Sequence, residues 1–214
     1  MPETSTDRAT ERASERATDR RIARTEQALR SALIDLTEER GLDGFTVGDL
    51  CERADVNRGT FYNHYADKDD LVASLAAEVT SGLEAFRDRT SGVGVTAVVR
   101  ADRRRQPLPL LVELFEYLRS QGDFLHAMLG SGGDAGFAPS LSEFVCENII
   151  KPLLHERYRT SSDAFVDYYL AFYANAYIGI ITRWVDTGMS ESAEEMSVIA
   201  LRLLFIKPGE SIKL

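Results

Sequence analysis

Apolar residues recur at helical spacing along most of the chain. In the first such stripe, large aliphatic side chains stand seven, four and three positions apart, at Ile22, Leu29, Leu33 and Leu36. This spacing predicts an amphipathic helix over about residues 21–40, and Gly41 stands where a helix ends. No segment shows the apolar–polar alternation of a half-buried strand. The pattern therefore predicts an all-α fold.

The next stretch predicts a short capped helix. Thr46 is a suitable N-cap, and Asp49 follows three positions later as an acidic partner for the free amides of the first turn. Leu50 and Ala54 then face inward. Asp55 stands where this helix must stop, because aspartate tolerates the left-handed backbone better than most residues.

A second short helix comes directly after the turn. Asn57 is placed to cap it, and the helix is expected over about residues 58–64, with Phe61 and Tyr65 packed inward. Two helices of about seven residues joined by a turn of about three have helix-turn-helix spacing. We therefore predict a helix-turn-helix over about residues 46–65, inside a three-helix domain at 21–70.

The rest of the chain, residues 71–214, predicts a helical bundle. A long helix capped by Asp67 runs to about Arg89, and the segment from 90 to 106 is expected to be a loop with one turn of helix. Glycine, serine and proline clusters divide the chain after residue 106 into separate helices. These are expected over about 108–120, 123–129, 139–158, 163–187 and 191–206.

The helix expected at 163–187 is apolar around nearly its whole circumference. A helix of this kind is buried on every side, and a chain of this size achieves that most easily by self-association. We therefore expect a homodimer that uses this helix and the next. The candidate interface residues are Tyr177, Gly179, Trp184, Leu203 and Leu204.

Composition narrows the class of protein. The chain has 214 residues, 44% of them hydrophobic, so it can bury a core without disulfides. Two cysteines make neither a disulfide framework nor a zinc finger, which indicates a reducing compartment. The first twenty residues lack the apolar core of a signal peptide, and the uncharged run at 168–182 is shorter than a membrane span. A cytoplasmic protein without a membrane partner is expected.

Charge is unevenly distributed. The formal net charge is −9, but between residues 20 and 30 four arginines oppose one glutamate. Residues 8–20 repeat arginine every fourth position, and residues 1–20 have no large apolar stripe, so they predict a disordered or fraying arm. The arm is either a solubilising tail or a contact to the DNA backbone.

The segment from Arg21 to Leu71 resembles the DNA-binding domain of the TetR family of bacterial transcriptional regulators. The residues that carry the resemblance are Thr46, Val47, Leu50, Ala54, Val56, Gly59, Thr60, Phe61, Tyr62, His64, Tyr65, Lys68 and Leu71. The later stretches LFEYLRSQGDFLHAMLG and YIGIITRWVDTGM resemble regulators of dihydroxyacetone kinase operons. Two positions depart from the family: Asp55 replaces the usual turn glycine, and Gly48 stands where members often carry a side chain that reaches DNA.

The resemblance implies a regulator that binds a palindromic double-stranded operator as a dimer, most simply as a repressor. Arg58 leads the recognition helix, and an arginine to guanine contact contributes on the order of 1–3 kcal/mol of discrimination. Asn63 is a second candidate for a base or backbone contact, and Gly59 permits close approach. Phosphate contacts are expected from Thr46, Thr60, Tyr62, His64 and Lys68.

A small-molecule effector is expected to enter the bundle and change the geometry of the DNA-binding helices. Candidate pocket residues are Phe115, Phe144, Tyr169 and Tyr173. No cofactor is expected. His126, His155 and Cys146 are potential metal ligands, but they lack ligand spacing, so no metal site is expected.

Two other functions stay open. One is a protein-binding coactivator that has this fold without DNA recognition, which the intact Arg58, Thr60, Tyr62 and Lys68 disfavour. The other is an enzyme, which the sequence disfavours because it has no glycine-rich phosphate loop, metal motif or partnered nucleophile.

Overall fold

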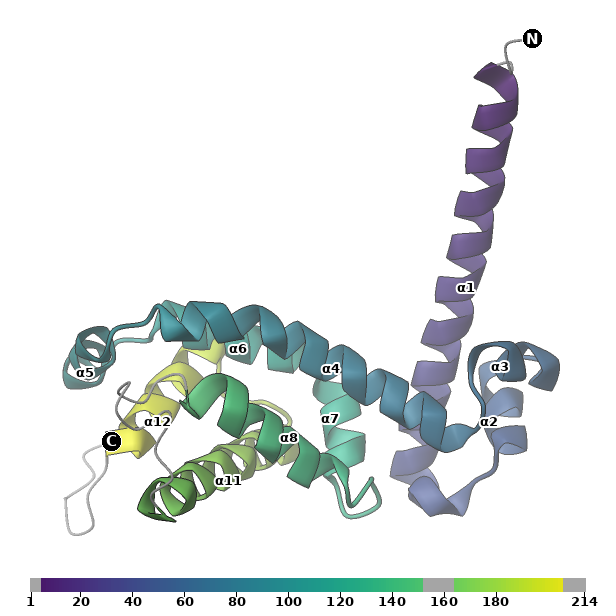
Figure 1. Ribbon diagram of the computed structural model, residues 1–214. Coiled ribbons are helices and arrows are strands. Elements are labelled where there is room, and N and C mark those ends of the chain that lie inside the picture. Colours follow the sequence, from purple (N-terminus) through teal and green to yellow (C-terminus); the bar gives the residue numbers. More distant parts are fainter. Residues whose placement is uncertain (1–4, 152–163, 206–214) are drawn as a thin grey trace. The chain divides into compact units, whose positions relative to one another are not determined.

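The computed structural model describes residues 5–151 and 164–205, and in this part of the chain all regular structure is helical (Figure 1). The predicted all-α fold is confirmed. The helices are α1 (Ser5–Arg40), α2 (Val47–Ala54), α3 (Arg58–His64), α4 (Lys68–Ser91), α5 (Val95–Arg104), α6 (Pro109–Ser120), α7 (Gly122–Leu129), α8 (Phe137–Val145), α11 (Ala164–Asp186) and α12 (Ala193–Phe205). A 3-10 turn, η1 (Leu42–Gly44), comes after α1, and a π-helical turn, η2 (Cys146–Ile150), continues α8.

The chain folds as two compact units, one through Leu75 and the other from Ala76 onward. Helix α4 carries the chain from the first unit into the second. The boundary predicted from the sequence, between residues 70 and 71, lies in the same helix.

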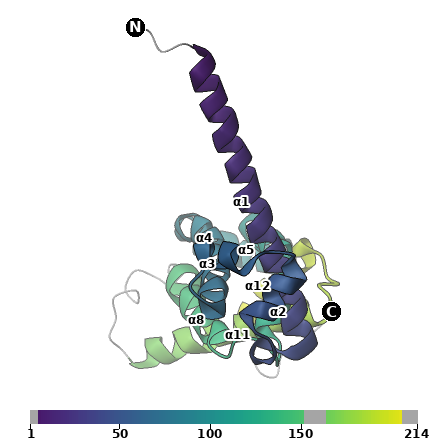
Figure 2. The ribbon, with the colours of Figure 1, turned by 90° about the vertical axis from the view of Figure 1, so that its right-hand side faces the viewer.

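The first unit is built on the second half of α1. Leu29, Leu33 and Leu36 are fully buried at the predicted spacing, whereas Ile22 is 38% exposed and lies outside the core. Helix α2 packs against this half of α1, and α3 packs against α2 (Figures 1 and 2). The stripe on α1 therefore supplies the surface on which the helix-turn-helix packs.

Helix α1 ends as predicted but begins earlier. Gly41 has a φ of 74°, a left-handed conformation that favours glycine, and its amide donates to the Thr37 carbonyl at 2.9 Å. At the other end the helix continues to Ser5, where a disordered or fraying arm was expected. Residues 5–20 contain no glycine or proline and place acids at i+3 from arginines, so the sequence contains nothing that stops a helix already nucleated downstream.

The second unit contains a helix that the sequence pattern did not predict. The segment expected to be a loop forms α5 over ten residues. Val98 and Ala101 are buried on one face of α5 and pack with Leu201 of α12. Packing of this apolar face stabilises a short helix. The glycines and arginines in and around the segment made it resemble a loop in the sequence.

The other helices of the second unit lie close to their expected positions. The helix expected at 139–158 is described as α8 and η2, and residues 152–158 lie outside the described part. Trp184 of α11 is the large aromatic residue of this core: its ring meets Phe115 edge to face at 5.4 Å, and its Nε1 donates to the Glu191 carbonyl at 3.1 Å.

Helix α11 is buried on one side, not on every side. Its inner face packs against α7, α8 and α12. Three aromatic residues near its start point outward: Phe165 is 72% exposed, Tyr168 78% and Phe172 66%. By length and composition, this described helix is also able to cross a membrane, a property that core helices of soluble proteins share.

Candidate nucleic-acid interface and cavity

Helix α2 begins at a reciprocal cap. The Thr46 hydroxyl oxygen accepts a hydrogen bond from the Asp49 amide at 3.3 Å, and the Asp49 carboxylate accepts from the Thr46 amide at 2.8 Å. The carboxylate also accepts from the Thr46 hydroxyl at 2.5 Å. This is a capping box. The hydrogen bonds from Thr46, that of its side chain first, hold the pKa of Asp49 below its ordinary value.

The turn between α2 and α3 has the predicted geometry. Asp55 adopts φ 53° and ψ 44°, and its amide donates to the carbonyls at the end of α2. The Asn57 side chain accepts from the Gly59 amide at 2.8 Å and so caps α3. The predicted roles of Asp55 and Asn57 are confirmed, and together they fix the direction in which α3 leaves the turn.

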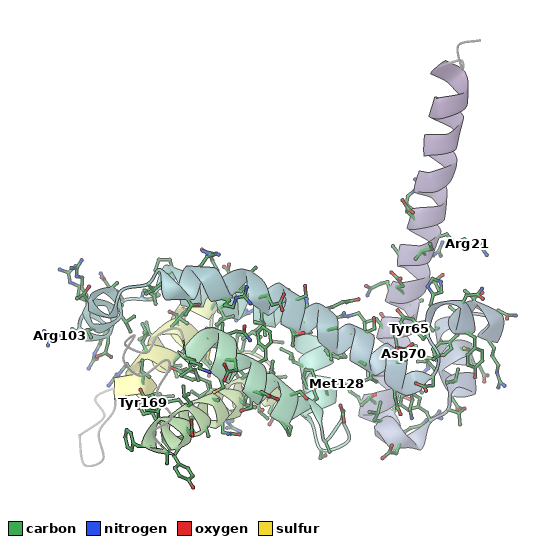
Figure 3. All side chains as sticks on the ribbon, in the orientation of Figure 1. Arg21, Tyr65, Asp70, Arg103, Met128 and Tyr169 are labelled. Carbon is green, nitrogen blue, oxygen red and sulfur yellow. The ribbon has the colours of Figure 1, made fainter. Side chains whose placement is uncertain are left out.

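Helix α3 has a buried face and an exposed face. Phe61 is fully buried and Tyr65 nearly so, and Tyr65 lies on the side of α3 nearer to α1 (Figure 3). Tyr62, the neighbour of Phe61, is 58% exposed. Arg58, Gly59 and Asn63 are exposed as well, and Thr60 is half-buried. The buried aromatic residues therefore hold a row of polar side chains in solvent.

Arg58 reaches from the start of α3 to the first turn of α2. A Cβ atom built on Gly48 would lie 2.3 Å from Nη2 of Arg58 and 3.1 Å from its Cζ. Within the described part of the chain, the side chains of Arg58 and Asn63 make no hydrogen bond or ion pair. Both are therefore available to an external partner. Gly48 was not among the predicted site residues.

His64 and Lys68 are less available. Nδ1 of His64 lies 3.9 Å from Oε1 of Glu26 on α1, and its side chain is half-buried. The Lys68 ammonium donates to the carbonyls of Leu42 and Phe45 and lies 4.7 Å from the centre of the Phe45 ring. The ammonium of Lys68 ties η1 to the start of α4, and its contact with DNA phosphate stays a prediction.

Positive charge on α1 lies near this domain. Arg21 and Arg24 are exposed, and neither has an ion-pair partner in the described part of the chain; Figure 3 labels Arg21 on α1. Further along, Arg53 of α2 binds the Glu39 carboxylate through two hydrogen bonds of 2.8 Å. That hydrogen bonding lowers the pKa of Glu39. Arg53 is thus engaged in holding α2 to α1, whereas Arg21 and Arg24 are available to a polyanion.

The second unit encloses an apolar cavity of about 370 Å³. Helices α4, α5, α6, α8, α11 and α12 and the turn η2 all contribute to its wall. Its polar lining groups are the hydroxyls of Thr90, Tyr169 and Tyr177, and no charged residue lines it in the described part of the chain. A volume above about 300 Å³ and an apolar wall with few polar groups are typical of a small-molecule site.

Each of the three hydroxyls already has a partner. Thr90 donates to the Phe86 carbonyl at 2.7 Å, and Tyr177 donates to the Ala200 carbonyl at 3.2 Å. Tyr169 bonds to Tyr173, and their ring centres lie 4.6 Å apart. Burial raises the pKa of Tyr177 well above its ordinary value and also raises that of Tyr169. Both phenols are therefore neutral at physiological pH.

Two of the four predicted pocket residues line this cavity. Phe115 and Tyr169 do, whereas Phe144 and Tyr173 do not; Figure 3 labels Tyr169 on α11. Tyr177, expected at the dimer interface, lines the cavity instead. The helix positions are right, but the sequence does not reveal which side of α11 turns toward the cavity.

Two family comparisons cover most of the described chain. The family described as bacterial regulatory proteins, tetR family, matches residues 29–75, and a family described as transcriptional regulator C-terminal region, TetR_C_8, matches residues 105–205. The chain belongs to the TetR family. The resemblance seen in the helix-turn-helix residues is confirmed.

Individual relatives of this TetR-family protein agree with that result. An uncharacterized HTH-type transcriptional regulator, YxbF of Bacillus subtilis (strain 168), is 39% identical over 56 residues, which is 26% of this chain and only 15% of that protein. A TetR regulator structure from Streptococcus agalactiae 2603V has a TM-score of 0.56 at 21% identity, over 89% of this chain and 98% of that one. The structure of the dihydroxyacetone kinase operon activator DhaS has a TM-score of 0.53 at 20% identity, over 84% of this chain and 93% of that one. At these identities the two structures show a shared fold.

The predicted interface residues of the TetR-family protein separate into two sets. Trp184 is buried beneath Arg119 and beside Phe115, so its assignment to a dimer interface is corrected. Leu204 lines the cavity together with Tyr177. Gly179 is exposed with no atom within 4 Å of a Cβ placed on it, and Leu203 is exposed on α12. Only these last two lie on the outer surface.

No group of three or more potential metal ligands occurs among the described residues of the TetR-family protein. His155, one of the three potential ligands in the sequence, lies outside them. Cys146 is half-buried, and burial raises the pKa of its thiol.

Proposed function

We propose that this TetR-family protein is an effector-controlled repressor that acts in the cytoplasm and binds a palindromic DNA operator as a homodimer. The observation that carries the proposal is the exposed row of Arg58, Tyr62 and Asn63 on α3, held outward by the buried Phe61 and Tyr65. A recognition helix presents its first residues to base edges in the major groove.

In this proposal each exposed side chain has a distinct task. Arg58 reads a guanine, since its guanidinium forms two hydrogen bonds to O6 and N7. Asn63 contacts a base or a backbone oxygen, and Gly59 allows the helix to approach closely. Thr60 and Tyr62 donate to phosphates. Thr46 contributes only if its hydroxyl leaves Asp49, which makes it a weaker donor than the sequence suggests.

The dimer is proposed to form on the outer face of α11 and the adjoining part of α12. Phe165, Tyr168, Phe172 and Gly179 fall on one stripe of α11, and the first three are large, apolar and exposed. Three exposed aromatic residues on one stripe form an apolar patch that marks an interaction surface. A dimer is also what places two recognition helices about one turn of DNA apart, about 34–36 Å.

The proposed effector is a neutral, mostly apolar molecule bound in the cavity. The wall has no charged side chain in the described part of the chain, and its three hydroxyls are already engaged. A buried carboxylate would have no cation to balance it there, which costs several kcal/mol. The ligand acts on DNA binding by its differential affinity for two conformations.

Selection from a duplex library with a randomised core tests DNA binding. We expect the wild type to enrich one palindromic sequence, and Arg58→Ala to bind that duplex at least about tenfold more weakly in a fluorescence anisotropy titration. Glu52→Ala, an exposed change on α2, is the control and leaves the affinity unchanged. A protein that enriches nothing, or whose Arg58→Ala variant binds as well as the wild type, supports the coactivator alternative.

Displacement of a fluorescent apolar dye tests the effector class. We expect 1-decanol to displace the dye at least about tenfold more effectively than decanoate at pH 7, since only the carboxylate carries a charge into the cavity. Ala200→Leu, which fills the cavity from α12, abolishes dye binding. Equal displacement by the two compounds contradicts a neutral effector.

A further inference from the structure

The glycine at position 48 is half-buried and occupies a crowded place. Gly48 lies in the first turn of α2, where its φ is not in the left-handed region, so the backbone does not require glycine. The side chain of Arg58 fills the space in front of it. A Cβ atom at position 48 would lie 2.3 Å from Nη2 of Arg58, a separation that real Cβ atoms do not show.

The atom that would have to move is the end of a flexible side chain. The same Cβ would lie 3.1 Å from Cζ of Arg58 and 3.3 Å from Oγ1 of Thr46, and no backbone atom is as close. A methyl group at position 48 therefore displaces the guanidinium and leaves α2 and α3 in place. The guanidinium also acts on Cys51, one turn further along α2: burial raises the pKa of that thiol and Arg58 opposes the rise. Both observations place the charge of Arg58 over α2.

This arrangement limits where Arg58 points. An arginine side chain normally loses considerable rotational freedom when it binds, at a cost that lowers affinity. Seated against Gly48, with no ion pair in the described chain, the guanidinium is directed across the helix-turn-helix before any partner arrives. A guanidinium limited to fewer directions discriminates between base pairs better than one that points in many, because its planar fork must align with two acceptors.

We propose that Gly48 is a specificity-determining residue of this protein. Because glycine has no side chain, the Arg58 guanidinium lies in the space where a Cβ atom of residue 48 would stand, and this positions Arg58 for base readout. Gly48 is a positioning residue, since it acts through Arg58 and needs no contact of its own with DNA. The inference rests on the proposed DNA-binding function. It predicts that the base preference of the protein depends jointly on positions 48 and 58.

A double-mutant cycle tests this dependence. The probes are the duplex enriched by the wild type from the randomised library and its single base-pair variants, titrated against wild type, Gly48→Ala, Arg58→Ala and the double variant. We expect Gly48→Ala to reduce discrimination at the base pair that Arg58→Ala affects, by about threefold or more, and to have no further effect once Arg58 is absent. Glu52→Ala is the control and changes discrimination at no position.

Each other outcome has a defined meaning. If the Gly48→Ala variant discriminates between base pairs as well as the wild type does, the role of Gly48 is overturned and the proposed function is unaffected. The role of Gly48 is also overturned if Gly48→Ala reduces discrimination between base pairs by the same factor when Arg58 has already been replaced by alanine. Alanine has the higher helix propensity, so Gly48→Ala should melt no lower than the wild type; a much lower melting temperature means that more than the guanidinium moved, and contradicts the inference. A wild type that enriches no sequence overturns the proposed function and this inference together.

Discussion

The two units of the molecule hold their candidate functional groups in opposite ways. In the first, side chains from one seven-residue helix point outward, and neighbouring caps and two buried aromatic residues fix their direction. In the second, side chains scattered between Leu83 and Leu204 point inward at one cavity. An outward row depends on local register, whereas a cavity depends on how distant helices meet. The consequences of substitution should differ accordingly.

The largest effect is expected in the core of the first unit. Phe61→Ala removes a fully buried ring and should lower the free energy of unfolding by about 3–5 kcal/mol. Tyr62→Ala, the exposed neighbour, is the matched control and should change stability by less than about 1 kcal/mol while weakening DNA binding. Urea unfolding followed by circular dichroism measures both. Similar losses from the two variants would show that α3 does not have distinct buried and exposed faces.

The fluorescence of Trp184 makes the same experiment specific to one unit. It is the only tryptophan of the chain and is buried in the second unit. For Phe61→Ala we expect the circular dichroism transition to shift more than the fluorescence transition. An equal shift of both would mean that the two units unfold as one.

A smaller effect is expected where two helices of the second unit touch. Gly82 of α4 lies against Tyr117 of α6, and a Cβ there would lie 2.0 Å from the Tyr117 hydroxyl oxygen and 2.2 and 2.6 Å from its ring atoms Cζ and Cε2. The Tyr117 hydroxyl also donates to the Val79 carbonyl at 3.0 Å. Because the aromatic ring is rigid, Gly82→Ala must push α6 away from α4, which should cost about 1–3 kcal/mol.

Gly92→Ala is the control for that substitution. Its Cβ would lie 3.5 Å from the Arg89 carbonyl oxygen, an ordinary contact, so stability should change by less than about 0.5 kcal/mol. Urea unfolding followed by Trp184 fluorescence measures both variants. A Gly82→Ala variant more stable than the wild type would mean that helix propensity outweighs the packing of Tyr117.

The contrast between the units also explains what the sequence could predict. The caps at Thr46 and Asn57 and the turn at Asp55 were predictable because each depends on residues within three positions of it. Helix α5 was not, because its stability comes from contacts with Leu201, a hundred positions later. The arm was expected to be disordered for lack of an apolar stripe, but the helix there continues from α1 and needs none.

Side-chain roles were harder to predict than helices. Lys68 has the residue type of a phosphate contact, and its ammonium also donates to the carbonyls of Leu42 and Phe45. Those two hydrogen bonds join residues more than twenty positions apart, so no local sequence pattern predicts them. Trp184 and Tyr177 lie on an apolar helix whose inner and outer sides look alike in sequence. Gly48 gave a signal, as a glycine inside a capped helix, but its meaning depends on Arg58, ten positions away.

A modest effect is expected at the start of α2. Thr46→Ala removes the N-cap and should lower stability by about 1 kcal/mol, since alanine cannot accept from the Asp49 amide. Thr46→Ser keeps the hydroxyl and should retain most of the stability. Thermal unfolding followed by circular dichroism distinguishes them. If both variants melt at the same reduced temperature, the methyl group of Thr46, and not the cap, supplies the stability.

The smallest effect is the dependence of the first unit on acid. Hydrogen bonds from Thr46 lower the pKa of Asp49 in the folded chain, so its carboxylate stabilises the fold above the ordinary aspartate value near 4. That contribution is lost as the pH falls through the lowered pKa. Asp49→Asn should therefore flatten the fall in melting temperature between about pH 5 and pH 2. Part of the slope should remain, because Arg53 lowers the pKa of Glu39 in the same unit and Arg89 lowers that of Glu113 in the second. An unchanged slope in Asp49→Asn would mean that those ion pairs, and not the capping box, set the acid response.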